Sequence, residues 1–142
     1  MSIPAEIWTG QWRWKADTAQ FTNPAQKHVW KEQTQEVVVK GNKLSMKTRQ
    51  VSMDGATRSW TWEGAFDGQP RPITWDQDGS IMATISFILL KDLLGGDVFQ
   101  SADGTFTGSE HFVISENLLQ VWGASTSGGK QYTYFEEWER IG

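Results

Sequence analysis

Two glutamates in aromatic surroundings are the side chains of this sequence best suited to chemistry. Alternate residues of a β strand share a face, and parity places Glu110 on an apolar one. That face also carries Phe106, Phe112 and Ile114. Burial among apolar groups raises the pKa of a carboxyl group, which can then act as a general acid or base. The alternative is that each carboxyl forms a structural ion pair with an arginine. The candidate arginines are Arg49, Arg58 and Arg140.

The second glutamate, Glu136, lies in the segment from Lys130 to Ile141. One face of this predicted strand carries Tyr132, Tyr134, Glu136, Trp138 and Arg140. The other face, which is expected to meet solvent, carries Gln131, Thr133, Phe135, Glu137 and Glu139. A cofactor-free isomerase, cyclase or lyase would use two inward carboxyls to move protons. If the protein is an enzyme, the predicted catalytic residues are therefore Glu110, Glu136 and Tyr134.

Nine tryptophans in 142 residues exceed what the packing of a small β domain requires. A pocket for a flat or conjugated hydrophobic molecule accounts for the excess. Core packing explains any single one of these side chains equally well. The residues predicted to contact such a ligand are Trp60, Trp62, Phe112, Trp122, Tyr132 and Tyr134.

Other chemistries find little support. The sequence has no cysteine, and its two histidines, His28 and His111, lie too far apart to form a local ligand pair, so no metal site is predicted. It contains no nucleophile elbow, phosphate-binding loop or dinucleotide fingerprint, so no cofactor is predicted. The net charge of -4, without a basic run, argues against nucleic-acid binding.

Turn signals along the chain define the elements that must position these side chains. Asp-Gly pairs, the strongest short hairpin signal, begin at residues 54, 67, 78 and 103. Further turns are predicted at Gly41-Asn42, Gly95-Gly96 and Gly128-Gly129. The segments between are rich in aromatic and β-branched residues, which favour strands. We predict one all-β domain over residues 1–142, a single antiparallel up-and-down barrel of roughly 8 to 10 strands that removes its edges by closing.

The segment from Ile81 to Leu94 fits two periodicities. Its apolar residues match the spacing of a helix of about three turns. Its β-branched residues and the flanking turn signals favour one or two strands, which is the preferred interpretation. A helix here would instead indicate a curved sheet with a packed helix, as in cystatins or nuclear transport factors.

The first predicted strand, Glu6 to Lys15, has Trp8, Trp12 and Trp14 on one face and contains Gly10-Gln11-Trp12. This motif resembles the Gly-x-Trp motif of the calycin superfamily, which includes lipocalins and fatty-acid-binding proteins. The resemblance implies that Trp12 closes the barrel and stacks against Arg140 of the last strand, a contact worth about 0.5–2 kcal/mol. The wider run from Gly10 to Phe21 is similar to small bacterial lipocalin-like proteins.

Three classes of function follow from these observations. The first is a protein that binds a small hydrophobic or aromatic molecule, and the second is a cofactor-independent enzyme that acts on one. The third is a protein-interaction module with an exposed tryptophan face, which self-association would reveal. The N-terminus has no apolar leader and the longest apolar stretch is too short for a bilayer, so we expect a cytoplasmic protein without a membrane span. A mature secreted form and the oligomeric state, a dimer included, stay open.

Overall fold

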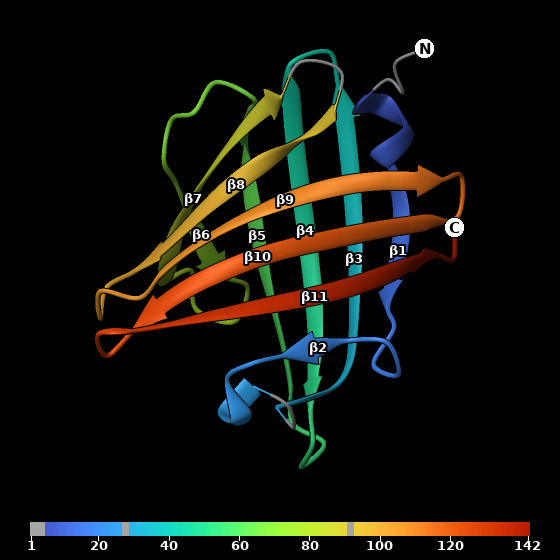
Figure 1. Cartoon of the computed structure of the whole chain (residues 1–142). Helices are drawn as coiled ribbons and strands as arrows, with labels where there is room; N and C mark the ends of the chain where they lie inside the picture. Colours follow the sequence, from blue (N-terminus) through green and yellow to red (C-terminus); the bar gives the residue numbers. More distant parts are fainter. Residues whose placement is uncertain (1–4, 27–28, 91–92) are drawn as a thin grey trace.

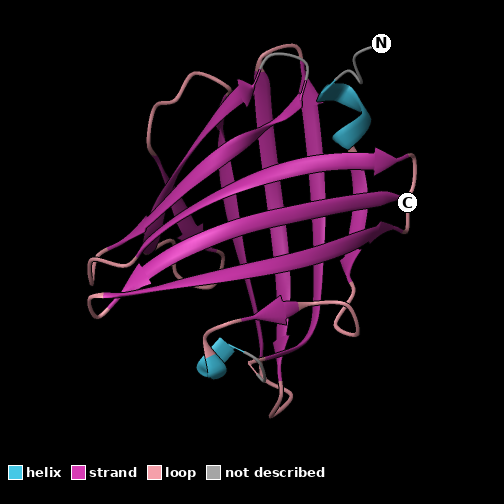
Figure 2. Cartoon of the chain, in the orientation of Figure 1, coloured by secondary structure: helices cyan, strands magenta, loops and turns pink. Residues whose placement is uncertain are grey.

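The computed structural model describes residues 5–26, 29–90 and 93–142. Strands dominate these residues (Figures 1 and 2). In chain order they are β1 (Gly10–Trp14), β2 (Gln20–Phe21), β3 (Trp30–Lys40), β4 (Lys43–Ser52), β5 (Thr57–Ala65), β6 (Arg71–Trp75), β7 (Ile81–Leu90), β8 (Leu93–Ser101), β9 (Phe106–Ser115), β10 (Leu118–Ser127) and β11 (Lys130–Arg140). Two short 3-10 helices are η1 (Ala5–Trp8) and η2 (Pro24–Gln26). No helix within the described ranges is long and apolar enough to cross a membrane.

Pairing between the first and last parts of the chain closes the sheet. Strands β3 to β11 pair antiparallel in chain order, and β1 pairs with both β3 and β11. Trp12 of β1 therefore lies between Gln35 and Arg140. These strands form a closed antiparallel up-and-down barrel of lipocalin type, which confirms the predicted fold class. The short β2 adds to another part of β11, where Phe21 lies opposite Tyr134.

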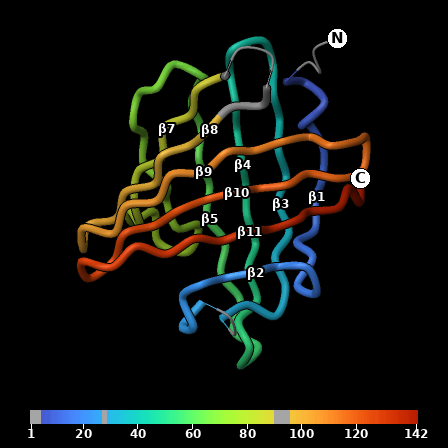
Figure 3. The backbone as a smooth tube through the Cα atoms, viewed as in Figure 1, coloured from blue at the N-terminus to red at the C-terminus, as the bar shows by residue number. Residues whose placement is uncertain are grey.

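Two walls of the barrel cross each other. The wall of β3, β4 and β5 runs steeply across the wall of β9, β10 and β11 (Figures 1 and 3). Because side chains alternate along each strand, every second residue of both walls points into the space between them. The core and the candidate site are built from these inward side chains.

The Asp-Gly pairs form turns in the same way at all four places. Glycines 55, 68, 79 and 104 have φ between 73° and 89°, a conformation that favours glycine. Each preceding aspartate accepts a hydrogen bond from the backbone N–H two residues further on, at 2.9–3.0 Å. The turn predicted at Gly95-Gly96 is wrong, because both glycines lie within β8.

The ambiguous segment from Ile81 to Leu94 belongs to β7 and β8, which confirms the strand interpretation and excludes the helix. Phe87 lies opposite Asp97 in this pair. The connection at residues 91 and 92 lies outside the described residues. The start of the chain differs from the prediction, because Trp8 belongs to η1 and β1 begins only at Gly10.

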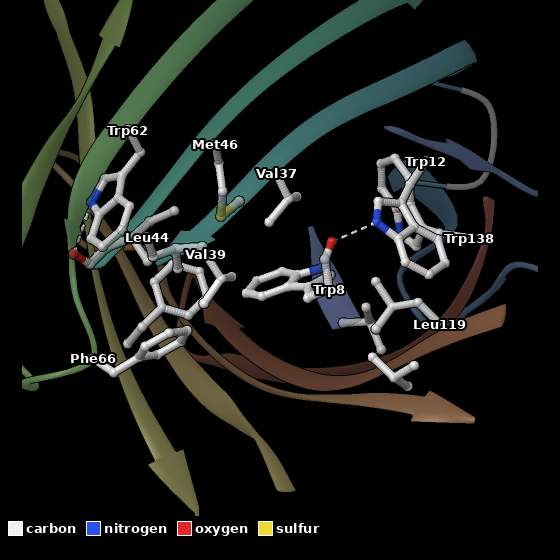
Figure 4. Close-up of a cluster of buried hydrophobic side chains, with 14 of the residues drawn as sticks. Trp8, Trp12, Val37, Val39, Leu44, Met46, Trp62, Phe66, Leu119 and Trp138 are labelled. Carbon is white, nitrogen blue, oxygen red and sulfur yellow. Dashed lines mark hydrogen bonds between the residues drawn. The ribbon is translucent and has the colours of Figure 1, made fainter. Parts of the chain in front are cut away.

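This difference lets the indole of Trp8 enter the barrel, where it is 1% exposed. In Figure 4 it lies between a group around Trp62 and Phe66 and a group around Trp12 and Trp138. The indole N–H of Trp12 donates a hydrogen bond of 2.9 Å to the carbonyl oxygen of Trp8. The helix η1 thus fixes the side chain that links two parts of the core.

The guanidinium of Arg140 lies over Trp12, with Cζ 4.4 Å from the ring centroid. Its nitrogens donate hydrogen bonds to the carbonyl oxygens of Ile7, Thr9 and Glu116. At Gly10, where φ is 146°, a Cβ would overlap this guanidinium. The Gly-x-Trp spacing therefore has a physical basis, because the glycine leaves room for the arginine that stacks on the tryptophan.

Candidate functional site

A cavity of about 580 Å³ opens inside the barrel. Part of it is lined by residues of β2, η2, the turn that joins β8 to β9 and the end of β10, namely Phe21, Gln26, Asp103 and Ser127. Its apolar wall consists of Met46, Trp60, Ile85, Phe99, Val121 and Trp138. The volume falls within the range of roughly 300–1,000 Å³ that is usual for small-molecule pockets.

Polar side chains of β8, β9 and β11 line another part of the cavity, which we call the polar wall. Asp97 of β8 lies opposite Ser109 of β9, and the Ser109 hydroxyl donates a hydrogen bond to the Asp97 carboxylate. His111 Nε2 lies 3.2 Å from Ser109 Oγ and 3.6 Å from Asp97 Oδ2. The imidazole packs against the indole of Trp8, with ring centroids 5.4 Å apart. Its Nδ1 atom is buried and has no hydrogen-bond partner within the described part of the chain.

Glu136 of β11 joins this wall through the strand register, because Val121 lies opposite both His111 and Glu136. Burial raises the pKa of Glu136 from 4.5 to about 7. The nearby indole N–H of Trp14 and the charge of His111 lower the pKa of Glu136 and so partly offset the effect of burial. The contact with Trp14 is not a hydrogen bond of normal geometry, because Trp14 Nε1 has no such partner among the described residues. The charge of Glu136 therefore changes near neutral pH.

Tyr134 lies across β10 because the residue opposite it is glycine. Gly123 is its cross-strand partner, and a Cβ at position 123 would overlap the phenol ring. The ring stacks on Phe21 of β2, with centroids 6.3 Å apart. Burial, reinforced by the charges of Asp97 and Glu136, raises the pKa of Tyr134. The phenol is thus a neutral hydrogen-bonding group at physiological pH.

Ser109, His111 and Asp97 do not form the arrangement of a serine hydrolase. In that arrangement the aspartate holds one imidazole nitrogen while the serine meets the other. Here Asp97 and Ser109 both face Nε2. The geometry suits hydrogen bonding and proton transfer rather than nucleophilic attack by serine.

The structure brings together three of the side chains selected from the sequence, because Trp60, Tyr134 and Glu136 all line the cavity. Two others lie elsewhere inside. Trp62 is 1% exposed in the core, where its indole N–H donates to the carbonyl oxygens of Arg71 and Ile85. Tyr132 shares the strand face of Tyr134 but does not line the cavity.

The remaining three, Glu110, Phe112 and Trp122, lie on the outer face of the barrel, contrary to the placement expected from parity. Glu110 is exposed, and Trp122 is 52% exposed and packs against Phe135. In β9 the prediction took the face with Phe106, Phe112 and Ile114 as the inner one because it is apolar, but this is the outer face, where Phe106 is 47% and Ile114 52% exposed. The strand also contains a bulge. Ser115 lies opposite Leu118 but Val113 lies opposite Leu119, so Ile114 is an extra residue. One extra residue reverses the faces of the rest of the strand.

The outer face carries a groove of about 690 Å³. Exposed apolar side chains from three strands border it, together with the carboxylate of Glu110. They are Ile88, Val98 and Trp122. If the protein is an interaction module, its partner is expected to bind this outer face. That function stays a prediction.

Sequence reasoning missed Asp97, Ser109 and His111 as site residues. Ser109 and His111 lie on the more polar face of β9, which was taken as the outer one, and the turn predicted at Gly95-Gly96 ended the strand before Asp97. Within the described ranges, no group of three or more histidine or acidic side chains is arranged to hold a metal ion.

Comparisons with known proteins concern the fold. No protein-family model matches the sequence, and no curated protein matches it. Among solved structures, a de novo designed fluorescence-activating β-barrel is similar with a TM-score of 0.52 and 16% identity, over 99% of this chain and 100% of that chain. The siderocalin Ex-FABP aligns with a TM-score of 0.49 and 13% identity, over 95% of this chain and 71% of that chain. The class that the fold defines is a closed, lipocalin-like up-and-down β-barrel.

Proposed function

We propose that the protein binds a small hydrophobic or aromatic molecule inside the barrel. The observation that carries this proposal is the cavity of about 580 Å³ with an aromatic wall and a polar wall. Trp60, Phe99 and Trp138 offer ring surfaces for stacking on a flat molecule. Tyr134 and Glu136 offer the few polar groups that fix a ligand's orientation.

A neutral aromatic probe, N-phenyl-1-naphthylamine, tests this proposal. We expect saturable binding of one probe per chain, followed by probe fluorescence and confirmed by native mass spectrometry. Trp60→Leu should weaken binding by up to about tenfold, because one aromatic contact is worth about 0.5–1.5 kcal/mol. The matched control is Trp122→Leu on the outer face, which should leave the Kd within about twofold.

The control variant also identifies the outcome against the proposal. If Trp122→Leu weakens binding and Trp60→Leu does not, the probe occupies the outer groove. If no saturable binding occurs, the cavity does not serve as a binding site for aromatic molecules. In both cases the search moves to protein partners of the outer face.

One observation favours a second candidate, a cofactor-independent enzyme that acts on the bound molecule. Glu136 has a pKa of about 7 and lies in the cavity beside His111 and Asp97, so it can accept and return a proton near neutral pH. Cyclisation, isomerisation and elimination need only such proton transfers and an oriented, desolvated substrate.

Glu136→Gln and Glu110→Gln separate binding from catalysis, because only Glu136 lines the cavity. For a compound that the protein converts, Glu136→Gln should lower kcat about 10²-fold or more, whereas Glu110→Gln should keep it. Full turnover by Glu136→Gln would leave binding as the function.

A further inference from the structure

The charges around the cavity narrow the chemical class of the ligand. We infer that the bound molecule carries a basic nitrogen, which Glu136 and Asp97 hold as a cation against the polar wall. This inference rests on the proposed binding function and specifies its ligand.

The charged side chains that line the cavity are predominantly acidic. Asp97, Asp103 and Glu136 contribute carboxyl groups, and His111 is the one lining side chain among the described residues that can become a cation. No described lysine or arginine lines the cavity. Charges interact more strongly in a partly buried site than in water, so this wall favours a positive group and disfavours a carboxylate.

Three arginines share the inward face of their strands, and all three are committed elsewhere. Arg71, opposite Ile85, forms an ion pair with Asp67. Arg58 lies between the indoles of Trp30 and Trp75, at 4.3 and 4.7 Å from their centroids, and donates to Gln50. Arg140 stacks on Trp12 and binds three backbone carbonyls. A fatty-acid-like anion would therefore find no guanidinium partner among the described lining residues.

One carboxylate oxygen of the polar wall can accept a hydrogen bond from the ligand. Asp97 Oδ1 accepts from Ser109, but Asp97 Oδ2 lies 3.6 Å from His111 Nε2, which is too long for a normal hydrogen bond. The indoles of Trp60 and Trp138, also in the cavity wall, attract cations through their ring faces. A ligand with an ammonium group on an aromatic ring would interact with the carboxyl groups of the polar wall and with the indoles of the apolar wall.

Binding of a cation should also be linked to the release of a proton. The titratable groups that face Glu136 are Asp97 from β8, His111 from β9 and Tyr134 from β11. The inward residues of β10 and β1 beside it, Val121 and Trp14, are uncharged. A bound cation favours the carboxylate form of Glu136, whose pKa is about 7, so affinity should rise with pH through that value.

Three probes with one ring system test the inference by isothermal titration calorimetry at about pH 8. They are 1-naphthylmethylamine, 1-naphthalenemethanol and 1-naphthoic acid. We expect the amine to bind at least about tenfold more tightly than the alcohol, and the acid to bind most weakly. Glu136→Gln should abolish most of the advantage of the amine over the alcohol. Glu110→Gln, the same chemical change on the outer face, should alter neither affinity.

Wild-type protein provides a readout that does not depend on the folding of a variant. Near pH 7, titrations of the amine in buffers of different ionisation enthalpy should show proton release. Equal affinities for the three probes, tightest binding of the acid, or amine binding without proton release would overturn the inference and leave cavity binding intact. If N-phenyl-1-naphthylamine and all three probes fail to bind, the proposed function falls and the inference with it.

Discussion

Glu136 shows how one residue can link the stability of this protein to its site. Its carboxyl group lies among Trp14, Val121 and the polar wall, where burial disfavours the charged form. A binding or catalytic group gains from this placement, because a carboxyl with a pKa near 7 can exchange a proton under ordinary conditions. The fold bears a cost in stability whenever that group is charged.

The first prediction concerns this cost. The pKa of Glu136 is about 7 in the folded protein against 4.5 in the unfolded chain, so the folded state holds the extra proton between these values. Its contribution to the free energy of unfolding therefore falls as pH rises from 4.5 to about 7 and stays low above that. Glu136→Gln should be more stable than wild type at pH 8 by about 1–3 kcal/mol, and little changed at pH 4, in urea denaturation.

Glu110→Gln is the control for this experiment, because Glu110 is exposed on the outer face. It should change stability by less than about 0.5 kcal/mol at both pH values. A Glu136→Gln variant less stable than wild type at pH 8 would show that the folded protein stabilises the carboxylate.

Gly10 carries the second prediction at this scale. An alanine there would adopt an unfavourable φ and displace the guanidinium of Arg140. Gly55 also has a positive φ, but no atom lies within 4 Å of where its Cβ would be. Gly10→Ala should therefore lower the free energy of unfolding by about 3 kcal/mol, against about 1 kcal/mol for Gly55→Ala. Equal losses in urea denaturation would mean that the contacts of Arg140 contribute nothing.

At the scale of the elements, the site depends on cross-strand neighbours. Strands β9, β10 and β11 bring Ser109, Gly123 and Tyr134 into one row, because each lies opposite the next. The missing side chain at Gly123 provides the space into which the phenol of Tyr134 folds. The polar wall therefore depends on the register in which the three strands pair, and not on any single strand.

The third prediction tests this row. Gly123→Ala should displace Tyr134, lower the free energy of unfolding by about 1–3 kcal/mol and weaken ligand binding. Gly108→Ala is the matched control on the neighbouring strand, because a Cβ at position 108 meets nothing within 4 Å. Denaturation and probe titration of both variants would decide the matter, and similar behaviour of the two would show that Tyr134 does not depend on Gly123.

The register also explains how much could be read from the sequence. The Gly128-Gly129 turn was predicted, and it places Gly123 opposite Tyr134 and Trp122 opposite Phe135. Opposite residues of a strand pair share a face, so the outward position of Trp122 could have been derived from that turn. The inward face of β11, with Tyr134 and Glu136, was predicted correctly.

The position of Glu110 could not be derived in the same way. With the pairing of Ser115 and Leu118 continued without a bulge, Glu110 would lie opposite Gly123 and face inward. The extra residue Ile114 shifts Ser109 into that place. Nothing in the local sequence marks this bulge, because it follows from how the strands close around the core. The same holds for η1, whose Trp8 leaves the strand pattern to enter the barrel.

At the scale of the whole molecule, stability is expected to vary around the barrel. Strands β3, β4, β10 and β11 pair over nearly their full lengths, whereas β2 contributes only Gln20 and Phe21 opposite Phe135 and Tyr134. Phe21 also lines the cavity. A short and sparsely paired strand therefore lies at the edge of the site.

Hydrogen exchange followed by mass spectrometry tests this fourth prediction. Amides around Phe21 should exchange through local opening, with protection well below that of β10, whose amides should exchange only on global unfolding. A bound ligand should raise the protection of the Phe21 region. Equal protection of β2 and β10 in the free protein would show that both open in a single cooperative unit.

The closure of β1 on β11 has a consequence for how the chain can be rewired. The backbone of Gln11 donates to Gly142 and accepts from Ile141, so the last residues lie against the first strand. A short linker could join these neighbouring segments, and new ends could be opened at the exposed turn of Asp78 and Gly79. In such a circular permutant, β11 would be followed in the chain by η1 and then by β1, so the two strands at the present seam would become neighbours in sequence. Comparing the folding of the permutant with that of the original chain would then show how the connectivity of the strands affects the order in which the barrel assembles.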